Sequence, residues 1–248
     1  MADAHRPPDR LFQQQLPGEE VPKARKTSAL AIIVPIIGIV GIPLVLILLP
    51  ILGILLPALS GARQAARQIK NTNQIRGINH GMTTYGAANH GYYPGLDSNG
   101  NPVDLTVENR IWTMLDSNLI SSDYMISPNE LKTTWQAGPL TSDNYSYTLL
   151  DISENGERRN EWRQTNNGMA ITISDRNTGS SAASQDVMSV NTQSPGYWAG
   201  SVAYNDGHAA YETIHEQDVK YGSGPTYQSD NIFEAAGEDD AMMIYQGD

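Results

Sequence analysis

Hydrophobic positions dominate residues 28–62 of the chain and become periodic beyond them. Between Lys26 and Arg63 lie 36 consecutive uncharged residues, most of them Ile, Leu, Val, Ala, Gly or Pro. A helix that crosses a bilayer needs about 20 such residues. The pattern therefore predicts a membrane-spanning segment at residues 28–62, which follows a polar N-terminal tail at residues 1–27.

Prolines divide this apolar segment at intervals of seven or eight residues. Each proline removes a backbone donor, and in lipid the freed carbonyl must find a partner in a neighbouring helix, a hydroxyl group or a tightened turn. One interpretation is a single tilted span, and the other is a hairpin of two short spans divided at Gly41 and Pro43. Lysine and arginine flank both ends of the segment, so charge alone does not choose between them. The prolines are Pro35, Pro43, Pro50 and Pro57.

Beyond Pro57 the apolar positions repeat at the spacing of a water-soluble helix. Small residues come first and larger ones follow, while arginine and glutamine fill the opposite face. We predict a spine helix within residues 63–90 that ends near Tyr85, before the glycines and the proline of GAANHGYYPG. Its apolar stripe is expected to pack against a sheet. The stripe consists of Ala58, Ala62, Ala65, Ala66, Ile69, Ile75, Ile78, Met82 and Tyr85.

The chain after residue 90 alternates strand-like runs with turns. This order predicts an α+β fold, in which a long N-terminal helix packs on an antiparallel sheet. Residues 107–120 place Ile111, Leu115 and Leu119 on one face and predict a short helix. The predicted strands are 145–150, 169–174, 200–205 and 208–213.

The last two predicted strands are joined by Asp206 and Gly207, a strong hairpin signal because both residues tolerate positive φ. His208 follows this turn and is expected to hydrogen-bond within the hairpin. We assign residues 91–220 to an α+β head. Residues 221–248 end in EAAGEDDAMMIYQGD, which looks like a poor core segment, and are predicted to form an acidic, partly disordered tail.

Charge is distributed unevenly and limits the classes of partner. The whole chain carries a net charge of −11, and from residue 77 onward seven basic residues face 23 acidic ones. Such a head would repel nucleic acid, which binds proteins that neutralise its phosphates. Cysteine is absent, which excludes disulfides and thiolate metal sites. Four basic residues with no acid between them follow the apolar segment: Arg63, Arg67, Lys70 and Arg76.

One loop has the spacing of a weak calcium site. In DSNGNPVDLTVE the residues Asp97, Asn99, Asn101 and Glu108 occupy positions 1, 3, 5 and 12 of a calcium-loop pattern. Pro102, however, stands where the loop needs a glycine for its sharp turn. Since Asp, Asn and Gly are also common in ordinary turns, calcium and a plain loop are the two interpretations.

Catalytic patterns are missing from the sequence. The five histidines show no HExxH or other metal spacing, and the serines lack a GxSxG elbow. No GxxxxGK[ST] phosphate loop occurs either. We therefore predict that the protein is not an enzyme. The four tryptophans are expected mainly in the core or half-buried on the sheet, with a sugar- or peptide-binding surface as the alternative.

The segments LLPALSGARQAARQ and NTNQIRGINHGMTTYGAANHGYYPG, followed by ISDRNTG (173–179) and GSVAYNDGHAAYE (200–212), give a resemblance to a known family. Together they resemble prepilin-type, pseudopilin-like proteins of the branch that is abundant in planctomycete bacteria. The resemblance covers roughly residues 36–212 through three or four close segments. The matching family positions are Pro57, Arg63, Arg67, Asp175, Arg176, Asp206, Gly207 and His208.

Two departures from the family pattern concern processing. Precursors of this type are cut after a glycine and carry a glutamate at the fifth position of the mature helix, whereas Pro35 and Val40 stand at those places here. The resemblance therefore implies an uncut, membrane-anchored relative.

The resemblance implies a single-pass protein of the inner membrane whose C-terminal head is extracytoplasmic. Its partners would be the lipid bilayer and other copies or related chains, in a homo- or hetero-oligomer formed through the hydrophobic helix. The expected function is structural, in a type II secretion or type IV pilus-like assembly or in the cell envelope. The alternative is an anchored extracytoplasmic module that binds calcium, a glycan or a basic partner and does not polymerise.

Overall fold

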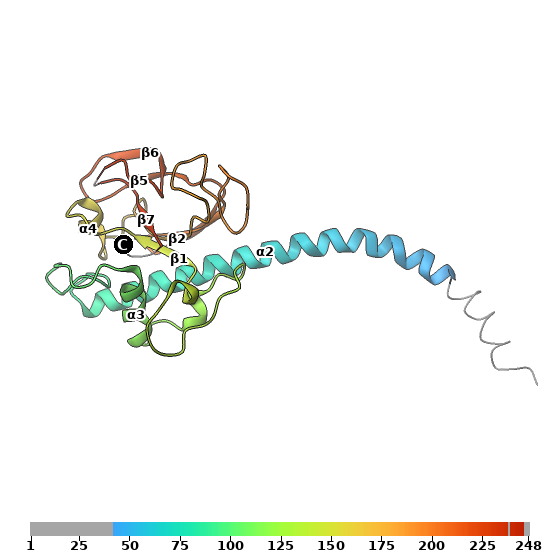
Figure 1. The fold of residues 1–248 in the computed structure, drawn as a ribbon, viewed down its shortest axis with the longest axis horizontal. Coiled ribbons are helices and arrows are strands. Elements are labelled where there is room, and N and C mark those ends of the chain that lie inside the picture. The colour runs from blue at the N-terminus through green and yellow to red at the C-terminus, as the bar shows by residue number, and fades with distance from the viewer. Residues whose placement is uncertain (1–41, 238, 246–248) are drawn as a thin grey trace, which may run out of the picture. The chain divides into compact units, whose positions relative to one another are not determined.

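The computed structural model describes residues 42–237 and 239–245 (Figure 1). The predicted polar tail and the part of the predicted membrane segment before residue 42 lie outside these described residues, as do the positions of Pro35 and Val40. The chain divides into two compact units at Pro57. The second unit, which begins at Ala58, contains the residues predicted as spine helix, head and C-terminal tail.

The fold of the described residues is α+β, as predicted. Its longest element is helix α2, Ile42–Ala88, which contains Pro50 and Pro57. The helix runs three residues past the predicted end at Tyr85 and stops before His90 and Gly91, which both adopt positive φ. Among residues 42–237 and 239–245, no helix combines the length and the apolar character that a membrane crossing requires.

Five antiparallel strands form the main sheet, in the order β4-β3-β2-β1-β7. A separate two-stranded sheet pairs β5 with β6. Each of the four strands predicted from the sequence is present and is one or two residues shorter than predicted; β2 begins two residues later and ends one residue later than expected. The main sheet contains β1 (Tyr147–Leu150), β2 (Ile171–Asp175), β3 (Gly200–Tyr204), β4 (Ala209–Glu212) and β7 (Met243–Ile244); the small sheet contains β5 (Glu216–Lys220) and β6 (Thr226–Asn231).

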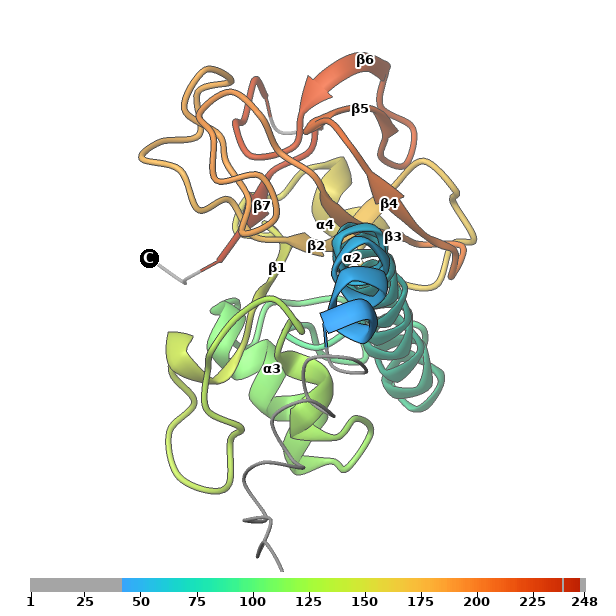
Figure 2. The same cartoon turned by 90° about the vertical axis from the view of Figure 1, so that its right-hand side faces the viewer.

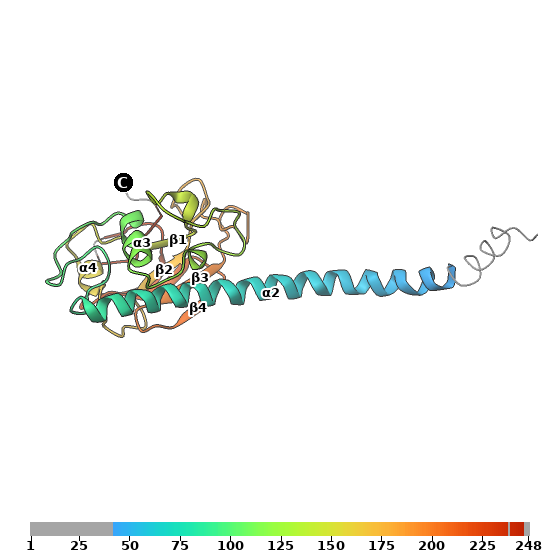
Figure 3. The same ribbon diagram turned by 90° about the horizontal axis from the view of Figure 1, so that it is seen from below.

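The central strands are covered on both faces. All residues of β1, β2 and β3 are buried. Figure 2 shows α3 and the small sheet on opposite sides of these strands, and Figure 3 shows the C-terminal part of α2 beside β3 and β4. Two predicted core tryptophans, Trp162 and Trp198, are fully buried. This double coverage explains why the strands read as nearly continuous apolar or small residues rather than as a strict alternation.

Helix α3, Val107–Asp116, is the short helix predicted at 107–120, but it ends four residues early. Ile111 and Leu115 are buried as predicted, whereas Leu119 lies beyond the helix. The helix stops because Asn118 adopts a φ of 53°, and the amides of Asn118 and Leu119 then bond back to the carbonyls of Leu115 and Met114. This pattern is a Schellman motif, which asparagine tolerates better than most residues. Three shorter helices are η2 (Ser122–Met125), η3 (Ser142–Asn144) and α4 (Glu157–Glu161).

The predicted apolar stripe of the spine helix is only half correct. Its second part, Ile75, Ile78 and Met82, is fully buried. Its first part, from Ala58 to Ile69, is exposed, and the side chain of Ile69 is 64% accessible. The reason is that the hydrogen bonds between α2 and the sheet begin at about residue 71, and none of the described residues covers the small residues before that point.

The prediction of a poorly packed, partly disordered tail after residue 220 is wrong for the residues that the structure describes there. This segment supplies β6, and its last strand, β7, pairs with β1 at the edge of the main sheet. Ile232, Ala241 and Met243 are buried in the core. The acidic composition was misleading because Asp230 and Asp240 are themselves buried, each accepting hydrogen bonds from backbone amides.

Candidate functional site

Buried amide side chains connect α2 to the sheet and to the η2 segment. Asn71, Gln74 and Asn79 lie on the same face of α2 as the apolar stripe, and all three are buried. Asn79 donates to the carbonyl of Tyr204 in β3 at 2.6 Å, and Gln74 donates to the carbonyl of Asp123 at 3.0 Å. An amide that is buried with its partner in place fixes one position of the helix along the sheet, because sliding the helix would leave both groups unpaired.

Asn71 binds a buried carboxylate, Asp175, at the end of β2. Its Nδ2 donates to Asp175 Oδ2 at 2.5 Å and to Ser201 Oγ at 3.0 Å. The Ser201 amide donates to the same carboxylate oxygen at 2.7 Å. Tyr147, on β1, donates from its hydroxyl to Asn71 Oδ1 at 2.9 Å. We call these four residues the spine joint: Asn71, Tyr147, Asp175 and Ser201.

Burial governs the protonation of the spine joint. Removal from water raises the pKa of Asp175, and the negative charge of Glu130 adds to this effect, while the hydrogen bonds from Ser201 and Asn71 lower it; the balance leaves the pKa at about 7. Burial also raises the pKa of the Tyr147 hydroxyl, so Tyr147 stays a donor. The joint therefore contains one group, Asp175, that can gain or lose a proton near neutral pH.

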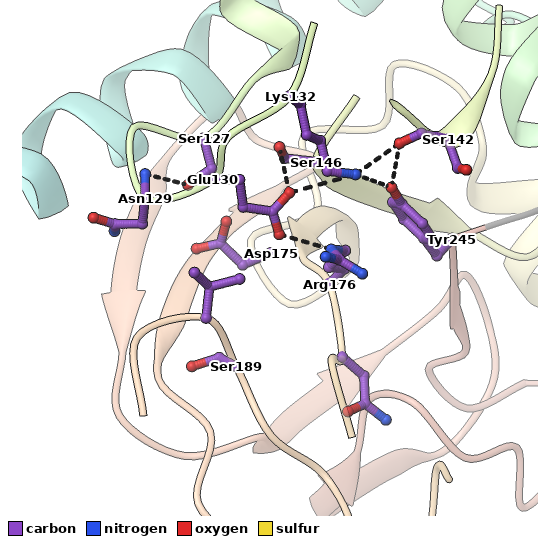
Figure 4. A network of polar contacts seen from close by, with 12 residues as sticks. Ser127, Asn129, Glu130, Lys132, Ser142, Ser146, Asp175, Arg176, Ser189 and Tyr245 are labelled. Atoms are coloured by element: carbon purple, nitrogen blue, oxygen red, sulfur yellow. Dashed lines mark hydrogen bonds and ion pairs between the residues drawn. The ribbon is translucent and has the colours of Figure 1, made fainter. Parts of the chain in front are cut away.

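A second polar network adjoins the joint and is drawn in Figure 4. Its centre is Glu130, whose side chain is 5% exposed. Glu130 Oε1 pairs with Arg176 Nε at 2.7 Å, and Oε2 accepts a hydrogen bond from Ser146 Oγ at 2.8 Å. Lys132 Nζ lies 3.4 Å from Oε2. The carboxylate is thus balanced by two cations, which is the usual condition for keeping such a charge inside a protein.

Lys132 links this network to the C-terminal part of the chain. Its ammonium donates to the carbonyls of Ser142 and Tyr145, each at 2.7 Å, and to the hydroxyl of Tyr245. Burial lowers the pKa of Lys132, and the charge of Glu130 opposes that shift. Every donor of the ammonium has an acceptor, so its role in the described residues is to hold the segment after β7 against the loop before β1.

The predicted hairpin residues form a compact turn. Asp206 Oδ1 accepts hydrogen bonds from the His208 amide at 3.0 Å and from His208 Nδ1 at 2.5 Å. Gly207 has a φ of +89°, and the imidazole of His208 stacks on Tyr204 with ring centres 4.1 Å apart. Partial burial raises the pKa of Asp206, but the hydrogen bonds and charge of His208 outweigh it and leave that pKa below its usual range. The predicted hydrogen bonding of His208 within the hairpin is confirmed.

The family-motif residues do not converge on one site. Pro57, Arg63 and Arg67 lie on the exposed part of α2. Asp175 belongs to the spine joint and Arg176 to the Glu130 network. Asp206 and Gly207 line a groove of about 780 Å³ beside α2, together with Asn73, Arg76, His80, Gln164 and Asn166.

The predicted calcium residues are used for other contacts. Asp97 accepts hydrogen bonds from the amides of Asn99 and Asn101, both at 2.8 Å, which makes a local Asx-type turn. Glu108 lies in α3 and accepts a hydrogen bond from the Tyr145 hydroxyl at 2.6 Å. In the described part of the chain, no three acidic or histidine side chains converge as metal ligands would. The geometry favours the plain-loop interpretation.

Several residues of the two networks were not singled out from the sequence, namely Asn71, Glu130, Lys132 and Ser201. A usable signal existed for Asn71, since it lies four residues before Ile75 on the buried face of the helix, where an amide needs a specific partner. Glu130 and Lys132 lie in a loop, and no periodic pattern marked them.

The comparisons with known proteins give no family for this chain: no family model, no curated protein and no solved structure matches it.

Proposed function

We propose that this chain is a membrane-anchored, pseudopilin-like structural protein, in which an apolar helix lies in the inner membrane and carries an α+β head on the extracytoplasmic side. The observation that carries the proposal is a group of exposed leucines along α2. They are between 48% and 64% exposed, although a fully buried leucine gains about 1.5–3 kcal/mol. The group consists of Leu46, Leu49, Leu55, Leu56 and Leu59.

An exposed apolar surface of this kind favours a surrounding of lipid or of other apolar helices. The same helix, α2, also contains residues of the second unit that are buried against the sheet, which is compatible with an anchoring part followed by a supporting part. The segments that carry the sequence resemblance lie in regular elements of this fold. LLPALSGARQAARQ lies in α2, ISDRNTG begins in β2, and GSVAYNDGHAAYE forms the β3–β4 hairpin. Residues 28–41, which the proposed anchor also needs, lie outside the described residues.

The role we propose is structural, as part of a type II secretion or pilus-like assembly or of the cell envelope. With Pro35 and Val40 at the processing and glutamate positions, the anchor would stay uncut. A single span and a hairpin are both compatible with this role. The spine joint and the Glu130 network support it because they hold helix, sheet and C-terminal segment in one arrangement, as a load-carrying subunit needs.

The second candidate function is an anchored binding module that does not polymerise. The polar groove beside α2 favours it, since its volume suits a small polar ligand such as a sugar. An enzyme has less support, because no nucleophile and base are hydrogen-bonded to each other at this groove in the described residues.

Cysteine crosslinking in cells separates the two functions. The native chain contains no cysteine, so every adduct of the chain forms through the one cysteine that is introduced. Ala62→Cys labels the exposed part of α2, and Tyr197→Cys, whose parent side chain is 70% exposed, labels the head. Ladders of self-adducts through Ala62→Cys, without ladders through Tyr197→Cys, support assembly by the helix. Adducts only to other proteins support the binding module.

The side of the membrane is tested separately. In spheroplasts with an intact inner membrane, added protease should remove the region after residue 90. Full protection of that region, with cleavage on lysis as the control, would contradict an extracytoplasmic head.

A further inference from the structure

Three basic residues form a continuous exposed row on α2. Arg63, Arg67 and Lys70 are spaced by four and three residues, which places them on one face of the helix. All three are exposed, and none takes part in the ion pairs found among the described residues. No acidic residue occurs anywhere from position 27 to position 96 of the sequence. The row is therefore a surface of one charge with no internal counterion.

The row begins where the exposed leucines end. Leu59, 48% exposed, lies four residues before Arg63 and so one turn away on a neighbouring position of the same face, about 6 Å along the axis. A face that changes from leucine to arginine within one turn has the chemistry of a boundary between hydrocarbon and a charged layer. Long basic side chains suit such a boundary, because their methylene stems remain in apolar surroundings while the charge reaches outward.

We propose that Arg63, Arg67 and Lys70 bind the phosphate groups of anionic phospholipids where α2 leaves the bilayer. The inference rests on the proposed membrane anchor and names the lipid class that the anchor prefers. Charge complementarity favours this occupant, because the guanidinium group holds phosphate oxygens in pairs. The rest of the second unit is strongly acidic and is repelled by an anionic surface, so the row supplies the attraction that keeps the exit point at the headgroups.

The test uses the full-length chain, purified in mild detergent and reconstituted by dilution with vesicles. One set of vesicles contains only phosphatidylcholine, and the other is an equal mixture of phosphatidylcholine and phosphatidylglycerol. The triple variant Arg63→Gln/Arg67→Gln/Lys70→Gln removes the row and keeps good helix formers. Arg163→Gln removes an exposed charge from the head and is the control for losing a basic residue outside the row. Flotation on a density gradient measures the bound fraction.

We expect the wild type to bind both sets and to prefer the anionic set. Each basic residue near such a surface contributes about 1 kcal/mol, so each neutralised charge should weaken the preference about fivefold. The triple variant should lose the preference while still binding phosphatidylcholine, and Arg163→Gln should keep it. The preference should also decline with added salt.

Other outcomes separate this inference from the proposed function. If wild type and triple variant bind both vesicle sets equally, the lipid preference is wrong and the anchor stands. If the wild type binds neither set, the anchor itself fails. If the triple variant keeps its lipid preference but loses self-crosslinking through Ala62→Cys, the row contacts a second copy, and the lipid inference is overturned.

Discussion

The two parts of α2 within the second unit have similar small and polar compositions but opposite surroundings. From Ala58 to Lys70 the side chains are mostly exposed, whereas from Asn71 onward amides and aliphatic residues alternate on a buried face. Both parts keep helical periodicity. The two parts differ in their neighbours, because among the described residues only the second part of α2 packs against strands and hydrogen-bonds to their carbonyl groups. Periodicity thus identifies a face of a helix, and specific partners decide whether that face is buried.

The largest expected effect concerns the carboxylate that the buried part of α2 contacts. Folded Asp175 has a pKa of about 7, against 3.8 for an ordinary aspartate, so the folded chain binds more protons between these values. The stability supplied by protonated Asp175 is complete below about pH 4 and is lost as the pH rises to about 7. Asp175→Asn should therefore be stabilised relative to the wild type by an amount that grows across this range, up to ~4 kcal/mol.

Urea denaturation followed by tryptophan fluorescence, at a series of pH values, measures this difference. Burial also raises the pKa of Asp230, to about 6, but that residue is common to both chains and cancels. A difference in unfolding free energy that stays constant from pH 4 to pH 8 would show that Asp175 does not titrate in this window.

The next effect compares two asparagines two positions apart. Asn71→Ala removes one of the two donors to Asp175 and the acceptor of the Tyr147 hydroxyl, and should cost roughly 2–3 kcal/mol of unfolding free energy. Asn73→Ala, on the exposed face, should change it by less than about 0.5 kcal/mol. The same urea titrations measure both. Equal costs would mean that the spine joint contributes nothing beyond helix propensity.

The smallest effect compares two glycines of α2. A methyl group at Gly81 would lie 2.5 Å from Ile120 Cγ2, so Gly81→Ala should destabilise the fold by about 1 kcal/mol through overpacking. At Gly61 nothing lies within 4 Å, and Gly61→Ala should stabilise the helix by roughly 0.5–1 kcal/mol. Thermal unfolding midpoints should therefore move in opposite directions. A shift of both in the same direction would contradict the contrast between the two parts.

The sequence predicted the elements of the fold better than their surroundings. The spine helix, the four strands and the Asp206-Gly207 hairpin followed from periodicity and turn chemistry, which act locally. The exposure of Ile69 and the burial of Asn71 did not follow, because both depend on where the sheet ends against the helix. The segment containing β7 was misjudged for the same reason, since its few apolar residues become core only through pairing with a distant strand.

The candidate site shows the same contrast between local contacts, which the sequence predicts, and long-range contacts, which it does not. His208 could be placed in its turn from the sequence because its partner, Asp206, is two residues away. Glu130 and Lys132 lie two residues apart in one loop, but Arg176 follows β2, so the ion pairs of this network form only in the folded molecule. The calcium spacing of Asp97, Asn99 and Asn101 described a turn that closes on its own amides, which is the commoner outcome for such sequences.

The position of β7 at the edge of the main sheet has a consequence for folding kinetics. β1 to β4 follow one another along the chain and pair in that order, whereas the contact of Leu150 with Met243 closes a loop that contains all the strands between them. Closing such a long loop costs conformational entropy before any contact can stabilise it. We therefore expect β7 to pair with β1 only after the transition state for folding. Substitutions at Met243 should then accelerate unfolding and leave the refolding rate nearly unchanged.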